Sequence, residues 1–160
     1  MASRPFAAAL TSITLLAAWL GASLLVAAVV APAAFEVLPS RTLAGALVGR
    51  VLPVLFWSGA LIGLAMAALA SGVSGRGWRI AAGLGIALPC AIAQLVVAPR
   101  IERIRAAVSG PMDALAVDDP RRLAFGKLHG ASVGLLGLAM IAAAVAVVLC
   151  FRTVLARSTT

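Results

Sequence analysis

Four long apolar runs constrain this chain more than any other feature of its sequence. Each is long enough to cross a bilayer as a helix, which takes about 20 apolar residues. Because a helix satisfies its own backbone hydrogen bonds in lipid, the runs predict an all-α integral membrane four-helix bundle. We expect a single polytopic membrane domain over residues 1–160, with spans at about 6–30, 43–70, 80–98 and 129–151.

The composition excludes the other broad classes of protein. Hydrophobic residues make up 63% of the chain and charged residues 11%, whereas soluble domains average roughly 45–50% and about 25%. Intrinsic disorder requires low hydrophobicity and high charge, which is the opposite of this composition. The net charge of +8 comes from cations that bracket the apolar runs, which is typical of headgroup anchors and not of a nucleic-acid patch. The expected partners are therefore the lipid bilayer and other membrane helices, in a homo-oligomer or a larger complex, and no nucleic acid.

Two short segments occur twice in the chain. The sequence Val-Val-Ala-Pro at residues 29–32 recurs at 96–99, and Gly-Leu-Ala-Met at 63–66 recurs at 137–140. A duplicated helical hairpin would explain both matches, with the two halves in the same orientation. In a chain rich in Ala, Gly, Leu and Val, chance would also produce such matches. Both explanations stay open at the level of sequence.

The connection between the third and fourth spans carries signals for helix ends. Asp118 and Asp119 precede Pro120, which predicts the start of the fourth helix near Pro120. After the third span, Ile101 and Ile104 share one face while charged residues take the others. This pattern predicts an interfacial helical extension of amphipathic character.

The sequence carries two opposing signals for the membrane orientation. An even number of spans places both termini on the same side, and we expect an integral protein of a bacterial inner membrane. Lys and Arg are more numerous in the connections opposite to the termini, which favours termini outside the cytoplasm. The basic residue Arg4 at the start of the first helix argues for the reverse.

Glycines form a stripe on two of the predicted helices. Small residues at this spacing let helix backbones approach closely in lipid, so the stripes predict helix packing. A glycine-lined passage for a small solute is the alternative. The stripes consist of Gly45, Gly49, Gly59 and Gly63 on the second helix, and of Gly126, Gly130, Gly134 and Gly137 on the fourth.

His129 is the only histidine, and it lies where the fourth helix enters the membrane. One histidine excludes bis-histidine haem ligation, and no zinc site with three protein ligands is assembled around it. The favoured interpretation is a hydrogen bond to a neighbouring helix. A proton-accepting group and one ligand of a soft-metal site are the alternatives.

Arg50 is the one charge that falls inside a predicted span. Ionisable residues within a membrane are candidates for function. Because Arg50 lies only about two turns into the helix, we expect it to reach the headgroups or to form an ion pair with Glu36 or Glu102.

No constellation of catalytic residues occurs. The five acidic residues lie in connections or interfacial segments, and the chain has neither a P-loop nor a dinucleotide-binding glycine cluster. The Cys and Met residues lack the spacing of a soft-metal site. We therefore expect no enzymatic activity, no cofactor and no bound metal.

Two motifs together resemble a known family. The first runs from Pro32 to Phe35 with Gly45 and Gly49 following, and the second runs from Phe125 to Ser132. Over nearly its whole length the chain resembles the transmembrane protein 205-like family, also called domain of unknown function 4149. The resemblance implies a small polytopic membrane protein of unassigned activity. The family-defining residues that it implies are Pro32, Phe35, Gly45, Gly49, Phe125, His129, Gly130 and Ser132.

Two hypotheses for function follow. A eukaryotic relative in this family is associated with tolerance to platinum drugs and with vesicle traffic, which implies handling of a small solute or a soft metal, here with His129 and the glycine stripes at the working site. The alternative is a non-catalytic accessory or assembly subunit that packs against a larger membrane protein complex through the glycine faces. The lack of intramembrane acids argues against ion-coupled transport.

Overall fold

The structure is a computed structural model that describes residues 4–70 and 75–158. These residues form helices and no strand, so the predicted all-α bundle is confirmed. Two of the elements, η1 and η2, are π-helical turns, and η3 is a short 3-10 helix. In chain order the elements are α1 (Arg4–Leu25), η1 (Val26–Val30), α2 (Ala31–Val37), α3 (Arg41–Ala68), α4 (Arg76–Ile92), η2 (Ala93–Val97), α5 (Ala98–Ala106), η3 (Met112–Ala114) and α6 (Pro120–Ser158).

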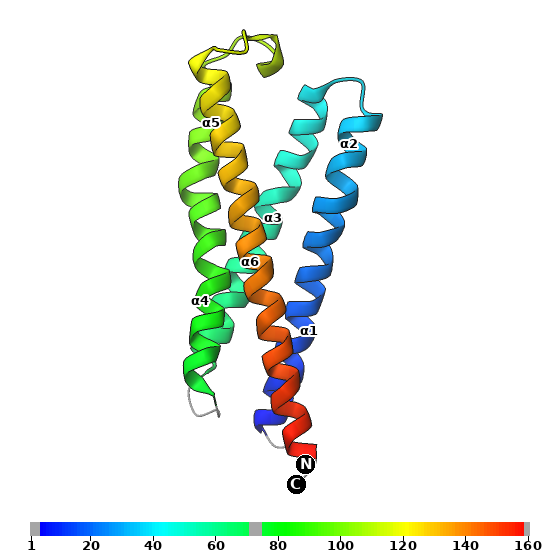
Figure 1. Cartoon of the computed structure of the whole chain (residues 1–160), viewed down its shortest axis with the longest axis vertical. Coiled ribbons are helices and arrows are strands. Elements are labelled where there is room, and N and C mark those ends of the chain that lie inside the picture. Colours follow the sequence, from blue (N-terminus) through cyan, green and yellow to red (C-terminus); the bar gives the residue numbers. More distant parts are fainter. Residues whose placement is uncertain (1–3, 71–74, 159–160) are drawn as a thin grey trace.

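The elements combine into four long rods that are apolar enough to cross a membrane (Figure 1). One rod consists of α1, η1 and α2, and another of α4, η2 and α5, while α3 and α6 each form a rod alone. The helical extension predicted after the third span is α5. It continues along α4 as part of the same rod, because the π-helical turn η2 keeps the backbone helical between the two.

The repeated Val-Val-Ala-Pro segments coincide with the two π-helical turns. The Ala31 N–H donates to the Val26 carbonyl, and the Ala98 N–H donates to the Ala93 carbonyl, each five residues back. Proline lacks an N–H, and its ring crowds the carbonyl four residues earlier. Pro32 and Pro99 each follow directly, so both rods relieve this crowding with a wider turn. Matching turns at equivalent positions are what a duplicated hairpin predicts.

The larger of two core clusters lies in the half of the bundle nearer the chain ends. On α6 its residues recur every three or four positions, from Leu136 through Ala139, Ala143 and Ala146 to Cys150, and all are buried. They pack in one cluster with residues of α1, α3 and α4. The indole Nε1 of Trp19 on α1 donates to the Leu55 carbonyl of α3 at 2.9 Å.

Gly59 and Gly63, the two glycines of α3 nearer the chain ends, lie at close helix contacts. A Cβ built on Gly63 would lie 2.5 Å from the carbonyl oxygen of Gly83 on α4, and one built on Gly59 would lie 2.6 Å from the Trp19 ring. Neither position has room for a side chain. At these two residues α3 lies directly against its neighbours.

The α6 glycines do not make the helix contacts that the sequence predicts. A Cβ on Gly126, Gly130, Gly134 or Gly137 would meet no described atom within 4 Å. The reason is that α6 has two faces of small residues, since Gly130 and Ala139 are nine positions apart and so about 180° apart on the helix. The alanine face is the one that packs in the core.

The start of α6 matches the prediction from sequence. The helix begins at Pro120, and the Asp119 carboxylate accepts a hydrogen bond from the Arg121 backbone N–H at 2.8 Å. The Arg121 side chain also forms an ion pair with Asp119 at 2.8 Å. These hydrogen bonds lower the pKa of the Asp119 carboxyl to about 2.

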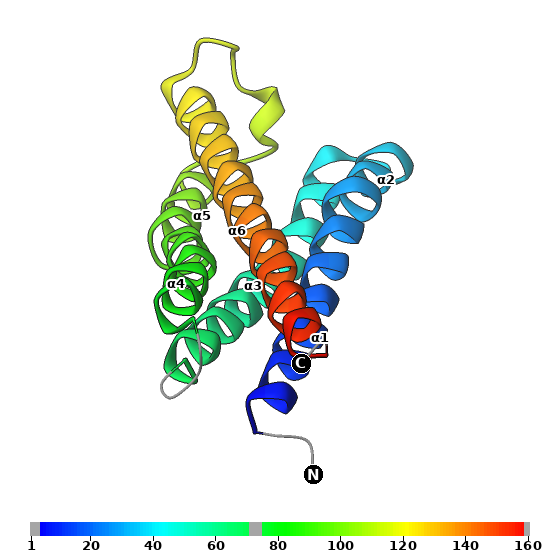
Figure 2. The same cartoon turned by 60° about the horizontal axis from the view of Figure 1, so that its bottom comes forward.

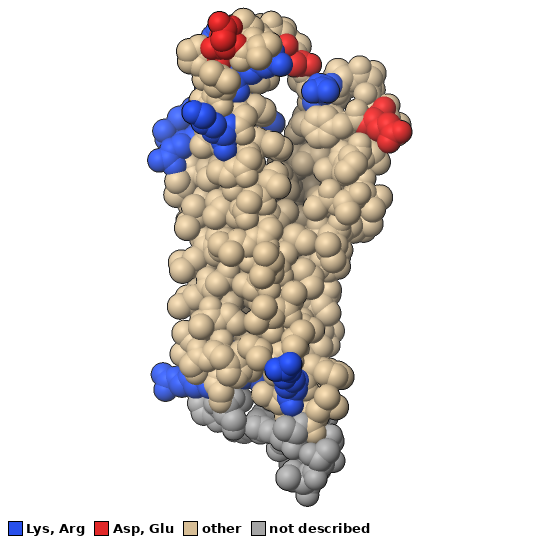
Figure 3. Space-filling model, viewed as in Figure 1, with Lys and Arg blue, Asp and Glu red and all other residues tan. Residues whose placement is uncertain are grey.

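The two ends of the bundle differ. α1 begins and α6 ends at the same end, whereas at the other end α2 and α3 diverge from α5 and α6 (Figures 1 and 2). All five acidic residues belong to segments at this second end, called here the charged end. Figure 3 shows the acids there together with many cations, above an apolar flank.

Candidate functional site

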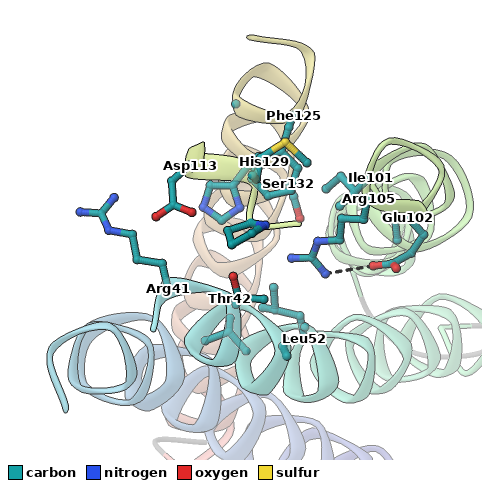
Figure 4. Close-up of a pocket in the computed structure, with 18 of the residues that line it drawn as sticks. Arg41, Thr42, Leu52, Ile101, Glu102, Arg105, Asp113, Phe125, His129 and Ser132 are labelled. Atoms are coloured by element: carbon teal, nitrogen blue, oxygen red, sulfur yellow. Dashed lines mark hydrogen bonds and ion pairs between the residues drawn. The ribbon is translucent and has the colours of Figure 1, made fainter. Parts of the chain in front are cut away.

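A cavity of about 650 Å³ lies between the diverging helix pairs at the charged end. Sites for small ligands commonly have volumes of roughly 300–1,000 Å³. The cavity is lined by residues of α2, α3, η2, α5 and α6, and by the segment 110–113 (Figure 4). The space-filling view has a hollow at the same place (Figure 3).

Most of the residues singled out from the sequence motifs converge on this cavity. They come from three segments of the chain that are far apart in sequence. Two motif residues do not line the cavity: Pro32 lies at the π-helical turn, and Gly130 faces away from the cavity. The motif residues that line the cavity are Phe35, Gly45, Gly49, Phe125, His129 and Ser132.

Gly45 and Gly49 border the cavity instead of a neighbouring helix backbone. A Cβ on either residue would lie 3.6 Å and 3.5 Å, respectively, from the guanidinium nitrogens of Arg105. The helix packing predicted for these two glycines is therefore not present within the chain. At this level α3 stays packed against α2 but has diverged from α5 and α6, and the two glycines leave room for a side chain from α5.

Arg105 is the central residue that the sequence analysis missed. Its Nη1 donates to the Glu102 carboxylate at 3.1 Å, and its guanidinium lies 5.5 Å from the centre of the Phe125 ring. Within the described part of the chain no acceptor binds its Nε or Nη2. The sequence pattern predicts that the charges of α5 lie among the headgroups. The spacing of Ala98, Ile101 and Arg105 could have placed Arg105 on the inward face, since these positions follow a helical period.

His129 lies on the wall of the cavity, one turn beyond Phe125. The two rings stack with 6.2 Å between their centres and an interplanar angle of 8°. The side chain of His129 makes no hydrogen bond to a neighbouring helix among residues 4–70 and 75–158, so the favoured interpretation of this residue is wrong. The imidazole instead points into the cavity near Ser132 (Figure 4).

Arg50 lies outside the cavity lining, and its side chain is exposed. The ion pairs among the described residues are Arg105 with Glu102 and Arg121 with Asp119. The expected pairing of Arg50 with Glu36 or Glu102 is therefore not found, and Glu102 pairs instead with Arg105, three residues further along α5. Contact of Arg50 with headgroups stays a prediction.

The polarity of the cavity changes from its mouth to its inner end. Arg41, Thr42 and Arg105 lie at the mouth, and the wall below them is apolar. Gln94 and Ser132 lie at the inner end. The apolar wall consists mainly of Phe35, Val48, Leu52, Phe56, Ala98, Ile101 and Phe125.

Arg122 fixes the segment beside the mouth. Its Nη1 donates to the carbonyl of Leu115 at 2.7 Å and to that of Asp113 at 3.4 Å. In the neighbouring wall, Pro53 of α3 has no N–H to donate to the Gly49 carbonyl four residues earlier. The cavity thus combines positioned donors and an apolar wall.

No group of three or more His, Cys, Asp or Glu side chains in the described residues could hold a metal ion. Cys90 and Cys150 are buried in the core, away from the cavity lining. The lining has two carboxylates, Glu102 beside Arg105 and Asp113 on the opposite side near Arg41, together with three arginines (Figure 4).

The comparisons with known proteins give one match. A family model described as a domain of unknown function, DUF4149, matches residues 14–109. This match confirms that part of the resemblance, while the likeness to transmembrane protein 205 stays a prediction. The matched region includes Phe35, Gly45, Gly49 and Arg105 and ends before α6. No curated protein and no solved structure matches the chain. The four apolar helices indicate an integral membrane protein.

Proposed function

This chain belongs to the DUF4149 family, a domain of unknown function, and we propose that it is a membrane protein that binds a small solute in the cavity between α3 and α6. The observation that carries this proposal is the convergence of the motif residues. Phe35, Gly49 and His129 come from three helices and line the same cavity. A chain that served only to fill space between helices would have no reason to keep open a cavity of this size.

A small solute fits this site better than a soft metal does. Soft metals are bound by thiolate and thioether ligands, and the buried cysteines lie elsewhere in the bundle. The cavity contributes a single thioether, that of Met112, together with His129, hydroxyl groups, an amide and arginines. Such groups bind a molecule through hydrogen bonds and charge.

A second candidate function has its own supporting observation. The α6 glycines Gly130 and Gly134 lie at open surface, with no described atom within 4 Å of an added Cβ. A flat glycine face of this kind can accept another membrane helix closely. The chain would then be an accessory or assembly subunit of a larger membrane complex, or a homo-oligomer.

Thiol labelling tests the small-solute proposal. We expect Ser132→Cys, at the inner end of the cavity, to react with a small water-soluble methanethiosulfonate reagent added at the charged end. Cys90 and Cys150 are fully buried, so the unaltered chain serves as the unreactive control. Adding Gly49→Leu should block the reaction by filling the cavity. If Ser132→Cys reacts no faster than the unaltered chain, the proposal is wrong.

The accessory-subunit alternative predicts a different result. Gly134→Leu would prevent the close approach of a partner helix and shift the chain to a smaller species on native gels of extracted membranes. Gly21 also faces open space, on α1, and Gly21→Leu is the matched control. An unchanged pattern in both variants would count against packing through α6.

A further inference from the structure

We propose that the ligand of the cavity is an anionic amphiphile, that is, a phosphate or carboxylate head group carried on an apolar chain. This inference rests on the proposed function and specifies the chemical class of the solute. Three features of the cavity carry it: a positioned guanidinium with free donors, an excess of positive charge at the mouth, and an apolar wall that begins directly below.

The guanidinium of Arg105 is held in place before any ligand arrives. Glu102 accepts from its Nη1 at 3.1 Å, the Phe125 ring lies 5.5 Å away, and Gly49 of α3 leaves space for it. These contacts leave Nε and Nη2 without an acceptor among the described residues. A planar guanidinium with one free edge, formed by Nε and Nη2, matches two oxygens of a phosphate or carboxylate.

The other polar groups at the mouth agree with an anionic head group. In Figure 4, Arg105 and His129 face the same space from α5 and α6, and Thr42 of α3 lies nearby. Arg41 lies across the mouth on the side of Asp113. The lining has three arginines against two carboxylates, and both carboxylates have an arginine close by or across the mouth. An added anion therefore meets a net positive site.

The wall below the mouth fits an apolar chain. Along α3 the lining beyond Arg105 runs from Gly49, which lies beside its guanidinium, to Phe56, a length of roughly 10 Å at about 1.5 Å per residue. Leu52 and Ile101 contribute apolar surface along this path. A ligand with its head at Arg105 and its chain toward Phe56 would lie parallel to the helices, as lipids lie in a bilayer. A small inorganic anion would leave most of this wall without contact.

Binding of short soluble probes to the purified chain in a non-ionic detergent tests the inference. Hexyl phosphate and hexanoate should bind, as measured by calorimetry or by a raised unfolding midpoint. Inorganic phosphate, hexanol and hexyltrimethylammonium should bind at least about 10-fold more weakly, since each lacks the chain or the negative charge. Dioctanoylphosphatidic acid distinguishes the source: tighter binding than hexyl phosphate indicates a lipid, and weaker binding indicates a free single-chain molecule. Both outcomes support an anionic amphiphile.

Two arginines on the same helix supply the matched variants. Arg105→Gln should weaken hexyl phosphate binding about 10-fold or more, whereas Arg103→Gln, at an exposed position outside the lining, should leave it unchanged. Unfolding midpoints without ligand verify that both variants fold. Gly49→Leu fills the cavity with a larger side chain and should also abolish binding of hexyl phosphate.

The outcomes separate the two proposals. If Ser132→Cys is labelled but hexyl phosphate and hexanoate do not bind, the ligand class is wrong and the proposed function stands. Hexyltrimethylammonium binding as tightly as hexyl phosphate would overturn the anionic head, and inorganic phosphate binding equally well would overturn the apolar chain. Equal losses in Arg105→Gln and Arg103→Gln would also contradict the inference. Failure of the thiol labelling would reject the proposed function itself.

Discussion

The closest helix contact in the bundle gives a quantitative prediction. A Cβ on Gly63 would lie 2.5 Å from the Gly83 carbonyl oxygen and 2.8 Å from the Ala87 backbone nitrogen. Ordinary contact begins near 3.4 Å, so Gly63→Ala falls short by about 0.9 Å. Both obstructing atoms belong to the backbone and cannot rotate aside. The substitution must therefore push α3 and α4 apart.

The expected loss follows from the cost of overpacking. Inserting an extra methyl into a packed site costs about 1–3 kcal/mol, and a contact with backbone atoms belongs to the upper part of this range. Alanine also gains up to about 1 kcal/mol over glycine as a helix former. Gly130→Ala has the same gain without a clash, since Gly130 faces open space. Relative to Gly130→Ala, Gly63→Ala should lose about 2–3 kcal/mol of unfolding free energy.

Reversible unfolding in mixed micelles, followed by circular dichroism, measures this difference. Gly83→Ala should cost about as much as Gly63→Ala, because its Cβ would meet the Gly63 carbonyl oxygen at 2.5 Å. The double variant should lose less than the two single losses together, since the helices separate only once. Equal stability of Gly63→Ala and Gly130→Ala would refute the close contact.

Three further predictions follow from other contacts. Trp19→Phe removes the bond from the indole to the Leu55 carbonyl and should destabilise the bundle by at least about 0.6 kcal/mol in the same unfolding assay; an unchanged midpoint would contradict this. The depressed pKa of Asp119, about 2, means that its stabilising effect is complete above the ordinary carboxyl pKa and is lost as the pH falls through about 2. The Arg121 amide should therefore exchange more slowly in the unaltered chain than in Asp119→Asn between about pH 5 and pH 7, and this difference should vanish near pH 2. A difference already lost at pH 5 would be inconsistent with that pKa. Ser109→Cys and Gly77→Cys lie at opposite ends of the bundle and should be labelled from opposite sides of the membrane; labelling from one side would reject the four-span arrangement.

The helices themselves were predictable, because length and hydropathy determine them locally. The start of α6 at Pro120 followed from residues adjacent in sequence. The inward face of α3 was also predictable, since Gly49 and Gly63 share a helical face. The contact that each glycine makes on that face was not predictable. Gly63 lies against α4 and Gly49 borders the cavity, and the difference depends on how far neighbouring helices diverge at each level.

The site was harder to predict for the same reason. The motifs identified Phe125 and His129, but the sequence gives no distance between α6 and α5. Arg105 therefore looked like one more cation near the headgroups, although it lies 5.5 Å from the Phe125 ring. On α6 the choice between the glycine face and the alanine face depends on which one the other helices cover. That is a property of the whole bundle.

Photolabelling tests the central claim, that the cavity is the ligand site, most directly. An alkyl phosphate with a diazirine in its alkyl chain would be added to the protein in bilayers and irradiated. Mass spectrometry of the peptides would then locate the labelled residues. We expect the label on cavity residues such as Leu52, Phe56 and Ile101, with loss of this label in Gly49→Leu. A label spread over the outward residues Val54 and Leu61, which are 68% and 65% exposed, and unchanged in Gly49→Leu, would contradict the account.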